Sequence, residues 1–107
     1  MNKLLTGTPA SSGKASGTAR IILEEKDFAD FQEGDVLVAR ITDPTMTILM
    51  NRAAAIVCDI GGITSHPSIV ARELGIPCVV ATNNATELIQ NGMKIIVDGD
   101  KGEVYLD

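Results

Sequence analysis

Short runs of β-branched residues alternate with helix-like segments through the middle of the chain, and this alternation restricts the possible folds most strongly. Apolar runs at 36–41, 54–59 and 77–82 have the length and composition of strands. The first of these runs is apolar enough for a strand that is buried on both faces. Strands that alternate with helices predict an α/β domain.

The expected helices are bounded by their end residues. The first begins at Asp43 and Pro44, the second covers 65–74 before Gly75, and the third covers 85–92. Apolar residues at helical spacing predict which side chains face inward. These are Met46, Leu49, Met50 and Ala53 in the first helix, and Ile69, Val70 and Leu74 in the second.

The two ends of the chain are expected to differ from the middle. Residues 7–18 are rich in glycine, serine and threonine and are expected to form a loop, followed by a strand at 18–23. A short helical turn before Gly34 follows that strand. Residues 94–106 predict a hairpin, so more than one sheet layer is expected.

Composition excludes several function classes. The chain has 107 residues, which predicts a single domain covering 1–107, and its net charge of −5 and three aromatic residues argue against nucleic-acid binding. No apolar run approaches the roughly 20 residues that span a bilayer. The first residues lack the apolar stretch of a signal peptide, so we expect no membrane association and a cytoplasmic location.

The two cysteines, Cys58 and Cys78, are expected to be thiols in a reducing compartment. A disulfide between them stays open from the sequence alone. A zinc site formed by both cysteines and His66 is another alternative, although their spacing lacks the close cysteine pair of common zinc motifs. We therefore expect no metal in this chain.

His66 is the only histidine, and the residues around it predict where it lies. It follows the pair Gly61 and Gly62, which permits a sharp turn because glycine lacks a Cβ. Pro67 comes next, and proline is tolerated in the first turn of a helix, where its missing N–H is not needed. His66 is therefore expected in the first turn of the helix at 65–74.

A helix N-terminus favours anions, because its first N–H groups are unpaired and the helix dipole is positive there. The hydroxyl of Thr64 or Ser65 can cap this end. Such a position suits an imidazole that becomes phosphorylated better than one that is permanently charged. The pattern therefore favours a nucleophilic histidine.

Other interpretations of the same residues stay open. A lone histidine near a helix start is often only an exposed or capping residue, and a glycine pair after a strand is often an ordinary turn. The loop around Lys14 contains glycines but lacks the spacing of a phosphate-binding loop. A serine–histidine hydrolase is a further alternative, but Ser65 is adjacent to His66 and no nucleophile-elbow motif is present.

The stretch "GGITSHPSIVARELGIPCVV", residues 61–80, closely resembles the phosphohistidine segment of the phosphoenolpyruvate-utilising enzymes, among them phosphoenolpyruvate synthase and pyruvate phosphate dikinase. The likeness extends to the segments 10–22, 34–59 and 91–106. The family pattern is a glycine pair, a hydroxyl residue, histidine, a small residue, two aliphatic residues and Ala-Arg. The residues that fill it are Gly61, Gly62, Thr64, His66, Ser68, Ile69, Val70, Ala71 and Arg72.

This resemblance implies a three-layer β/β/α swivelling domain, the mobile domain of these enzymes. His66 would carry a phosphoryl group between a nucleotide-binding domain and a phosphoenolpyruvate/pyruvate-binding domain, with magnesium on those partner domains and no cofactor in this chain. Gly61, Gly62, Thr64 and Ser65 would support the phosphoryl group. The resemblance also implies a threonine partner for the imidazole, either Thr45 or Thr47.

Two departures from the family pattern bear on function. Pro67 stands where the pattern has a small residue, which the first helical turn tolerates. A chain of 107 residues also has no room for a nucleotide-binding domain or a barrel, so it is not expected to turn over alone. The alternative function is a non-catalytic binding or regulatory relative with the same fold.

Overall fold

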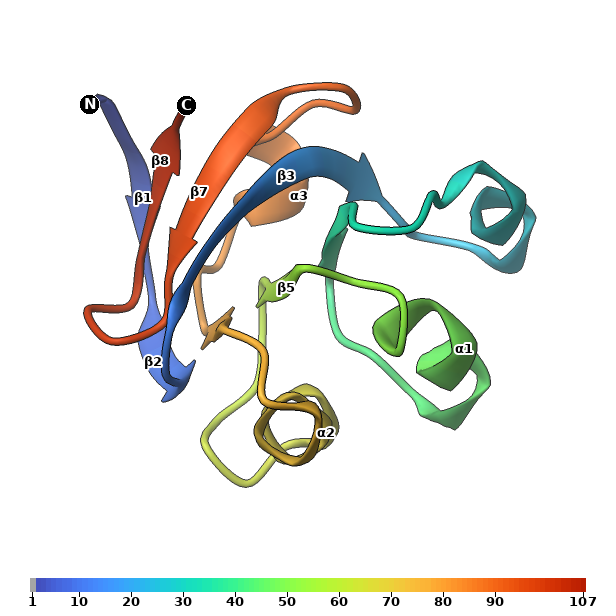
Figure 1. Ribbon diagram of the computed structural model, residues 1–107, viewed down its shortest axis with the longest axis horizontal. Helices are drawn as coiled ribbons and strands as arrows, with labels where there is room; N and C mark the ends of the chain where they lie inside the picture. The colour runs from blue at the N-terminus through green and yellow to red at the C-terminus, as the bar shows by residue number, and fades with distance from the viewer. Residues whose placement is uncertain (1) are drawn as a thin grey trace.

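Residues 2–107 are described by the computed structural model, in which eight strands form one mixed sheet in the order β1-β8-β7-β3-β4-β5-β6-β2 (Figure 1). Short helices connect or flank these strands. The strands are β1 (Asn2–Thr6), β2 (Thr8–Ser11), β3 (Lys14–Ile21), β4 (Val36–Ala39), β5 (Ala55–Cys58), β6 (Cys78–Val80), β7 (Lys94–Asp98) and β8 (Glu103–Leu106). The helices are η1 (Glu25–Asp30), η2 (Pro44–Met46), α1 (Thr47–Met50), α2 (His66–Leu74) and α3 (Ala85–Leu88).

Strand β3 belongs to both halves of the sheet. Its first part, 14–18, pairs antiparallel with β7, and its last part, 19–21, pairs parallel with β4. The parallel half continues through β5 and β6, and the antiparallel half continues through β8 to β1. The long β3 therefore lets the sheet fold over on itself into two layers (Figure 1).

Alternate residues of the central strand β4 face two different cores. Val36 and Val38 pack with apolar residues of the antiparallel half, including Ile95. Leu37 and Ala39 face the opposite core, which contains residues of α1 and α2. Because side chains alternate across a strand, one strand separates two cores. The expected three-layer β/β/α architecture is confirmed: antiparallel strands, parallel strands, then helices.

The opening of the chain is not a loop, and the prediction for 7–18 was wrong. Residues 8–11 form β2, which pairs with β6, and β3 already begins at Lys14. Gly7 joins β1 to β2 where the backbone passes so close to β6 that an added Cβ would lie 2.3 Å from the carbonyl oxygen of Val80. Long-range strand pairing overrides the local loop preference of this glycine- and serine-rich stretch.

The inward face of the first helix was predicted correctly, whereas in α2 only Val70 packs against the core as predicted. Met46, Leu49, Met50 and Ala53 are all buried. In α2, Ile69 is 44% exposed and Leu74 37% exposed, while the small residues Ser68 and Ala71 are fully buried. Small side chains let α2 approach β6 and β2 closely, so Ile69 and Leu74 turn outward.

All helices in the described part of the chain are short. The third helix, α3, ends at Leu88 rather than continuing to Gly92, and η2 and α1 together cover only 44–50. Within residues 2–107, no helix has the length and apolar character needed to cross a membrane.

Candidate active site

His66 is the first residue of α2, at the side of the molecule where the parallel strands end. The chain leaves β5 after Cys58 and passes through the loop 59–65, and Ser65 occupies the N-cap position with extended backbone. Pro67 follows in the first turn, and Gly75 ends the helix in a left-handed conformation. The predicted placement of His66 in the first turn is therefore confirmed.

The hydroxyl of Thr42 lies 2.7 Å from Nδ1 of His66. Thr42 lies in the segment that follows β4, and His66 lies in the segment that follows β5. Parallel strands end at the same edge of a sheet, so these two segments are close together. Only 4% of Thr42 is exposed, so its hydroxyl has little access to water. This side chain is the imidazole partner.

The implied partners Thr45 and Thr47 are therefore wrong. The hydroxyl of Thr45 donates to the carboxylate of Asp43, and the hydroxyl of Thr47 donates to the carbonyl oxygen of Pro44 at 2.8 Å. Both bonds are local ones that form at the start of the η2–α1 helical turn. Of these three threonines, Thr42 alone bonds to His66.

Bonding at Nδ1 determines which nitrogen of His66 can react. A neutral imidazole has one nitrogen that donates and one that carries a lone pair. If Nδ1–H donates to the Thr42 hydroxyl, the lone pair lies on Nε2. No hydrogen bond to Nε2 is formed by residues 2–107, and the ring is half-buried, so Nε2 can accept a group from outside the chain.

The loop before His66 is held by hydroxyl groups converging on one carbonyl. The hydroxyl of Ser65 donates to the carbonyl oxygen of Gly62 at 2.7 Å and accepts from the N–H of Gly62 at 3.2 Å. The hydroxyl of the buried Ser68 donates to the same oxygen at 2.6 Å. Ser65 therefore stabilises the loop and makes no side-chain capping bond to the helix, contrary to one reading of the sequence.

The two glycines of the loop have different roles. Gly61 has a φ of 126°, and an added Cβ would lie 2.8 Å from the hydroxyl oxygen of Ser65. Gly62 has open space around the corresponding position, with no atom within 4 Å. Gly61 is thus required by the backbone, whereas Gly62 leaves the surface in front of the helix start uncovered.

Arg72 ties the loop to the opening strand. One guanidinium nitrogen donates to the carbonyl oxygen of Ile63 at 2.6 Å, and another donates to that of Ala10 at 2.8 Å. The sequence pattern included Arg72 without indicating this role, because Ala10 is far away in the chain. The loop is consequently held by the serine hydroxyls near the start of α2 and by Arg72 at Ile63.

The predicted supporting residues come together on this one loop. Gly61, Gly62, Thr64 and Ser65 all precede His66 directly, and Thr64 is exposed beside it in the sequence. The serine–histidine alternative finds no support, because the hydroxyls of Ser65 and Ser68 bond to Gly62 rather than to the imidazole.

The cysteines lie in the core on the helical side. Cys58 and Cys78 are free thiols, and both are fully buried. Burial raises the pKa of Cys78 to about 12 and that of Cys58 well above its usual range. Metal binding needs thiolates, and no group of three histidine, cysteine or acidic residues in residues 2–107 is placed to hold a metal ion.

The three-layer β/β/α fold, with a half-buried histidine at the start of α2, is the architecture of a known class of enzyme domains. The family described as PEP-utilising enzyme, mobile domain, matches residues 31–102, which include Thr42, the loop and α2. The chain belongs to this family.

Curated relatives support the same assignment. The chain is 52% identical over 102 residues to a probable phosphoenolpyruvate synthase of Archaeoglobus fulgidus, covering 95% of the chain and 14% of that protein. It is 50% identical over 104 residues to a probable phosphoenolpyruvate synthase of Staphylothermus marinus, covering 95% of the chain and 12% of that protein. The chain thus spans about one seventh or less of the length of these relatives.

Solved structures show the fold more widely. A solution structure of an Enzyme I protein is similar with a TM-score of 0.64 and 36% identity, covering 75% of this chain and 33% of that one. The Thermococcus kodakaraensis aconitase X structure is similar with a TM-score of 0.70, covering 96% of this chain and 97% of that one. Its identity of 21% shows likeness of fold alone.

Proposed function

We propose that this chain is a phosphohistidine carrier domain and that Nε2 of His66 is the atom that carries the phosphoryl group. The observation that supports this most directly is the contact between Thr42 and Nδ1, because it occupies one ring nitrogen and leaves Nε2 as the nitrogen available to react. The family and the phosphoenolpyruvate synthase relatives favour a dikinase-type cycle, in which the histidine receives the phosphoryl group on one domain and passes it on at another.

In the loading step, the Nε2 lone pair attacks the phosphorus of the donor. The Nε2–P bond forms, the P–O bond to the donor breaks, and the electron pair leaves on the donor oxygen. Positive charge develops on the ring, and Nδ1–H remains donated to Thr42, which stabilises that charge. The reverse step passes the phosphoryl group to an acceptor oxygen and regenerates the neutral imidazole.

The start of α2 supports the negative charge of the bound group. The N-terminal N–H groups and the helix dipole attract anions, and Thr64, two positions before His66, is exposed. The uncovered surface at Gly62 leaves room for a phosphoryl group. Gly61, Gly62, Thr64 and Ser65 accordingly support the group by shaping the loop and supplying donors.

The chain lacks the other parts of the cycle. It spans 12% to 14% of the synthase relatives, so the nucleotide site and the phosphoenolpyruvate/pyruvate site belong to partner domains. Magnesium acts on those domains. The carrier itself provides a rigid histidine that alternates between the two sites.

Phosphorylation in trans tests the proposal. The chain is incubated with phosphoenolpyruvate, magnesium and a variant of the Archaeoglobus fulgidus relative whose own matching histidine is replaced by alanine. Intact mass is expected to show one added phosphoryl group that is stable in base and lost in acid. Long-range proton–nitrogen NMR is expected to place it on Nε2.

His66→Ala is the control for the site and is expected to abolish the added mass. A modification that persists in His66→Ala would place the group elsewhere. A wild-type chain that gains no phosphoryl group from phosphoenolpyruvate, or from ATP with the same partner, would favour the alternative function of a non-catalytic binding or regulatory relative.

A further inference from the structure

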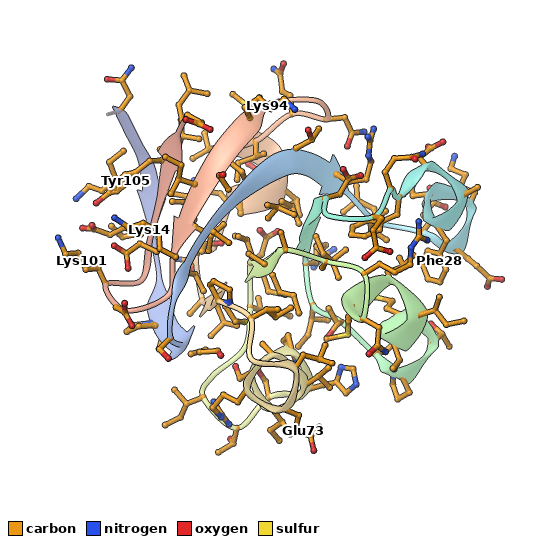
Figure 2. The ribbon with its side chains drawn as sticks, viewed as in Figure 1. Lys14, Phe28, Glu73, Lys94, Lys101 and Tyr105 are labelled. Atoms are coloured by element: carbon orange, nitrogen blue, oxygen red, sulfur yellow. The ribbon has the colours of Figure 1, made fainter. Side chains whose placement is uncertain are left out.

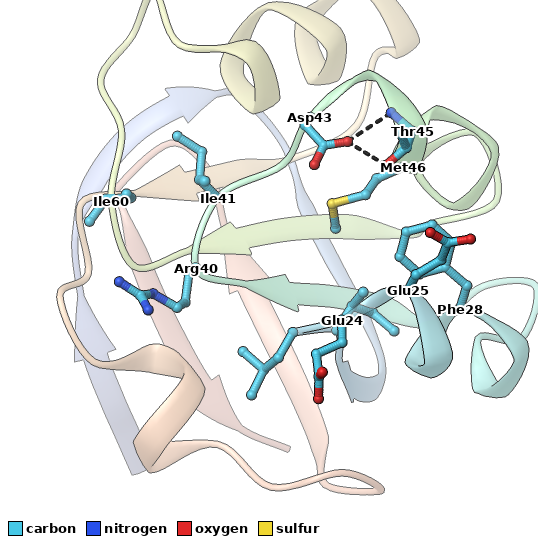
Figure 3. Close-up of a pocket in the computed structure, with 11 residues that line it drawn as sticks. Glu24, Glu25, Phe28, Arg40, Ile41, Asp43, Thr45, Met46 and Ile60 are labelled. Carbon is cyan, nitrogen blue, oxygen red and sulfur yellow. Dashed lines mark hydrogen bonds between the residues drawn. The ribbon is translucent and has the colours of Figure 1, made fainter.

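A groove beside the Thr42–His66 pair has no role in the phosphoryl chemistry described above. It has a volume of about 430 Å³ and is lined by residues 22–25, Phe28, 40–41, Asp43, 45–46 and Ile60 (Figure 3). We call it the η1 groove, because η1 forms one of its sides. Figure 3 shows Asp43 and Met46 on one side and Glu25 and Phe28 across from them.

The η1 groove and the imidazole share one side of the molecule. Thr42 stands in the chain between Ile41 and Asp43, which both line the groove. Asp43 directly follows Thr42, whose hydroxyl bonds to the ring, and hydrogen bonds from the hydroxyl and the N–H of Thr45 lower the pKa of Asp43. A surface that fills the groove therefore contacts the residues on both sides of Thr42, the residue bonded to His66.

Aliphatic side chains are exposed in this groove. Leu23 is 57% exposed, Ile60 48% and Ile41 41%. Ile63, in the loop before His66, is also 57% exposed. Neighbouring exposed aliphatic residues are typical of protein interaction sites, because burying them on binding is favourable.

The charges of the η1 groove indicate the chemistry of its occupant. Glu24, Glu25 and Asp43 line it against a single cation, Arg40. Within residues 2–107, Arg40 forms no ion pair with these carboxylates; Glu24 pairs with the exposed Lys26 at 3.5 Å, whereas Glu25 and Asp43 form no ion pair there. The excess of negative charge is complementary to a basic surface, and the net charge of −5 disfavours a second copy of this chain.

We propose, resting on the proposed function, that the η1 groove docks an aliphatic surface bearing lysine or arginine on the domain that exchanges the phosphoryl group with His66. Aliphatic contacts hold the two surfaces together, and the carboxylates orient the approach so that His66 faces the partner's reactive site. Docking at a fixed place near the imidazole holds His66 and the partner's reactive site in position, which favours transfer of the phosphoryl group between them.

The test measures the steady-state kinetics of phosphorylation in trans, using phosphoenolpyruvate and the same Archaeoglobus fulgidus variant. The double variant Glu24→Lys with Glu25→Lys reverses the charge of the groove. It is expected to raise the KM for the carrier chain about tenfold. The rate at saturating carrier is expected to change less than twofold, and added salt is expected to raise the KM of this variant less than that of the wild type.

Two matched controls separate the groove from general surface effects. Glu73→Lys with Glu87→Lys makes the same change in net charge, and Glu73 lies on α2 well away from Phe28 of the groove (Figure 2). Ile60→Ser removes an aliphatic side chain of the groove, and Leu88→Ser removes one on α3 that is equally exposed, at 48%. Only the groove variants are expected to raise KM.

The outcomes are distinct. Equal KM values for groove and control variants, with normal phosphorylation of the wild type, would overturn the η1 groove as a docking site and leave the carrier function intact. A wild type that is never phosphorylated would remove both proposals. A concentration-dependent dimer in sedimentation that Ile60→Ser dissociates would reassign the groove to self-association.

Discussion

At the scale of single residues, the buried hydroxyl of Thr42 lies 2.7 Å from Nδ1 of His66, and we propose that this contact determines which ring nitrogen reacts. A histidine has two nitrogens, and in the proposed carrier Nδ1–H donates to Thr42 while Nε2 keeps the lone pair that reacts. Thr42 does not touch the transferred group in this arrangement, so it is a positioning residue. The exposed residues of the loop surround the phosphoryl group, whereas the Thr42–Nδ1 contact is proposed to leave Nε2 as the reacting nitrogen.

Thr42→Val is expected to slow phosphorylation of His66 about fivefold, because a hydrogen bond with a net worth of about 1 kcal/mol no longer favours the reactive tautomer. The ¹⁵N shifts of the unmodified ring are expected to move toward the tautomer with the proton on Nε2. This spectroscopic change separates positioning from a loss of folding.

Two further variants act as controls for this effect. Thr42→Ser keeps the hydroxyl and is expected to restore both the rate and the ¹⁵N shifts. Thr47→Val removes a hydroxyl that donates only to Pro44, so it is expected to leave the ring unchanged. Unchanged tautomer populations in Thr42→Val would refute the role of Thr42.

At the scale of elements, the His66 loop acts as one hydrogen-bonded unit. The hydroxyls of Ser65 and Ser68 meet at the carbonyl of Gly62, and Arg72 joins the loop to β2. A loop fixed in this way presents His66 with little loss of conformational freedom when a partner binds.

Gly61→Ala is expected to lower the free energy of unfolding by about 1–3 kcal/mol. The φ of 126° is unfavourable for alanine, and the new Cβ would contact the Ser65 hydroxyl oxygen at 2.8 Å. Gly62→Ala is the matched control, because its Cβ meets nothing within 4 Å. Urea unfolding of both variants measures the difference, and equal losses of stability would contradict the distinct roles of the two glycines.

At the scale of the whole molecule, the parallel strands are shared by two cores, one against the antiparallel strands and one against the helices. Cys58 and Cys78 lie on the helical side, where burial keeps both thiols neutral. The charge state of these two groups therefore differs between the folded and unfolded chain at alkaline pH.

Stability is expected to fall as the pH rises above about 9, where unfolded thiols ionise. The folded pKa values are raised, so the stabilisation is complete below the unfolded pKa and is lost toward the folded values, about 12 for Cys78. Each thiol contributes a slope of about 1.4 kcal/mol per pH unit within this range.

Urea unfolding between pH 8 and about 11 measures this slope in the wild type and in the double variant Cys58→Ala with Cys78→Ala. The double variant is expected to be less stable near pH 8 because of its smaller core side chains, but to have a shallower alkaline slope. Equal slopes in the two proteins would show that the thiols are not the source.

Short-range patterns in the sequence predicted several features of the fold and the position of His66. The alternating strands and helices, the buried face of α1 and the place of His66 in the first turn of α2 all follow from residues close together in the chain. Glycine, proline and apolar spacing act through neighbouring backbone and side-chain contacts, so they can be recognised without the tertiary structure.

Tertiary structure decided the rest. Residues 7–18 look like a loop locally, yet they form strands because β6 and β7 supply their hydrogen bonds. Thr42 reaches His66 because β4 and β5 run parallel and end at the same edge, which brings together two residues 24 positions apart. The likeness to known enzymes implied a threonine partner, but only the packing of the strands determined which one, since local spacing does not encode long-range proximity.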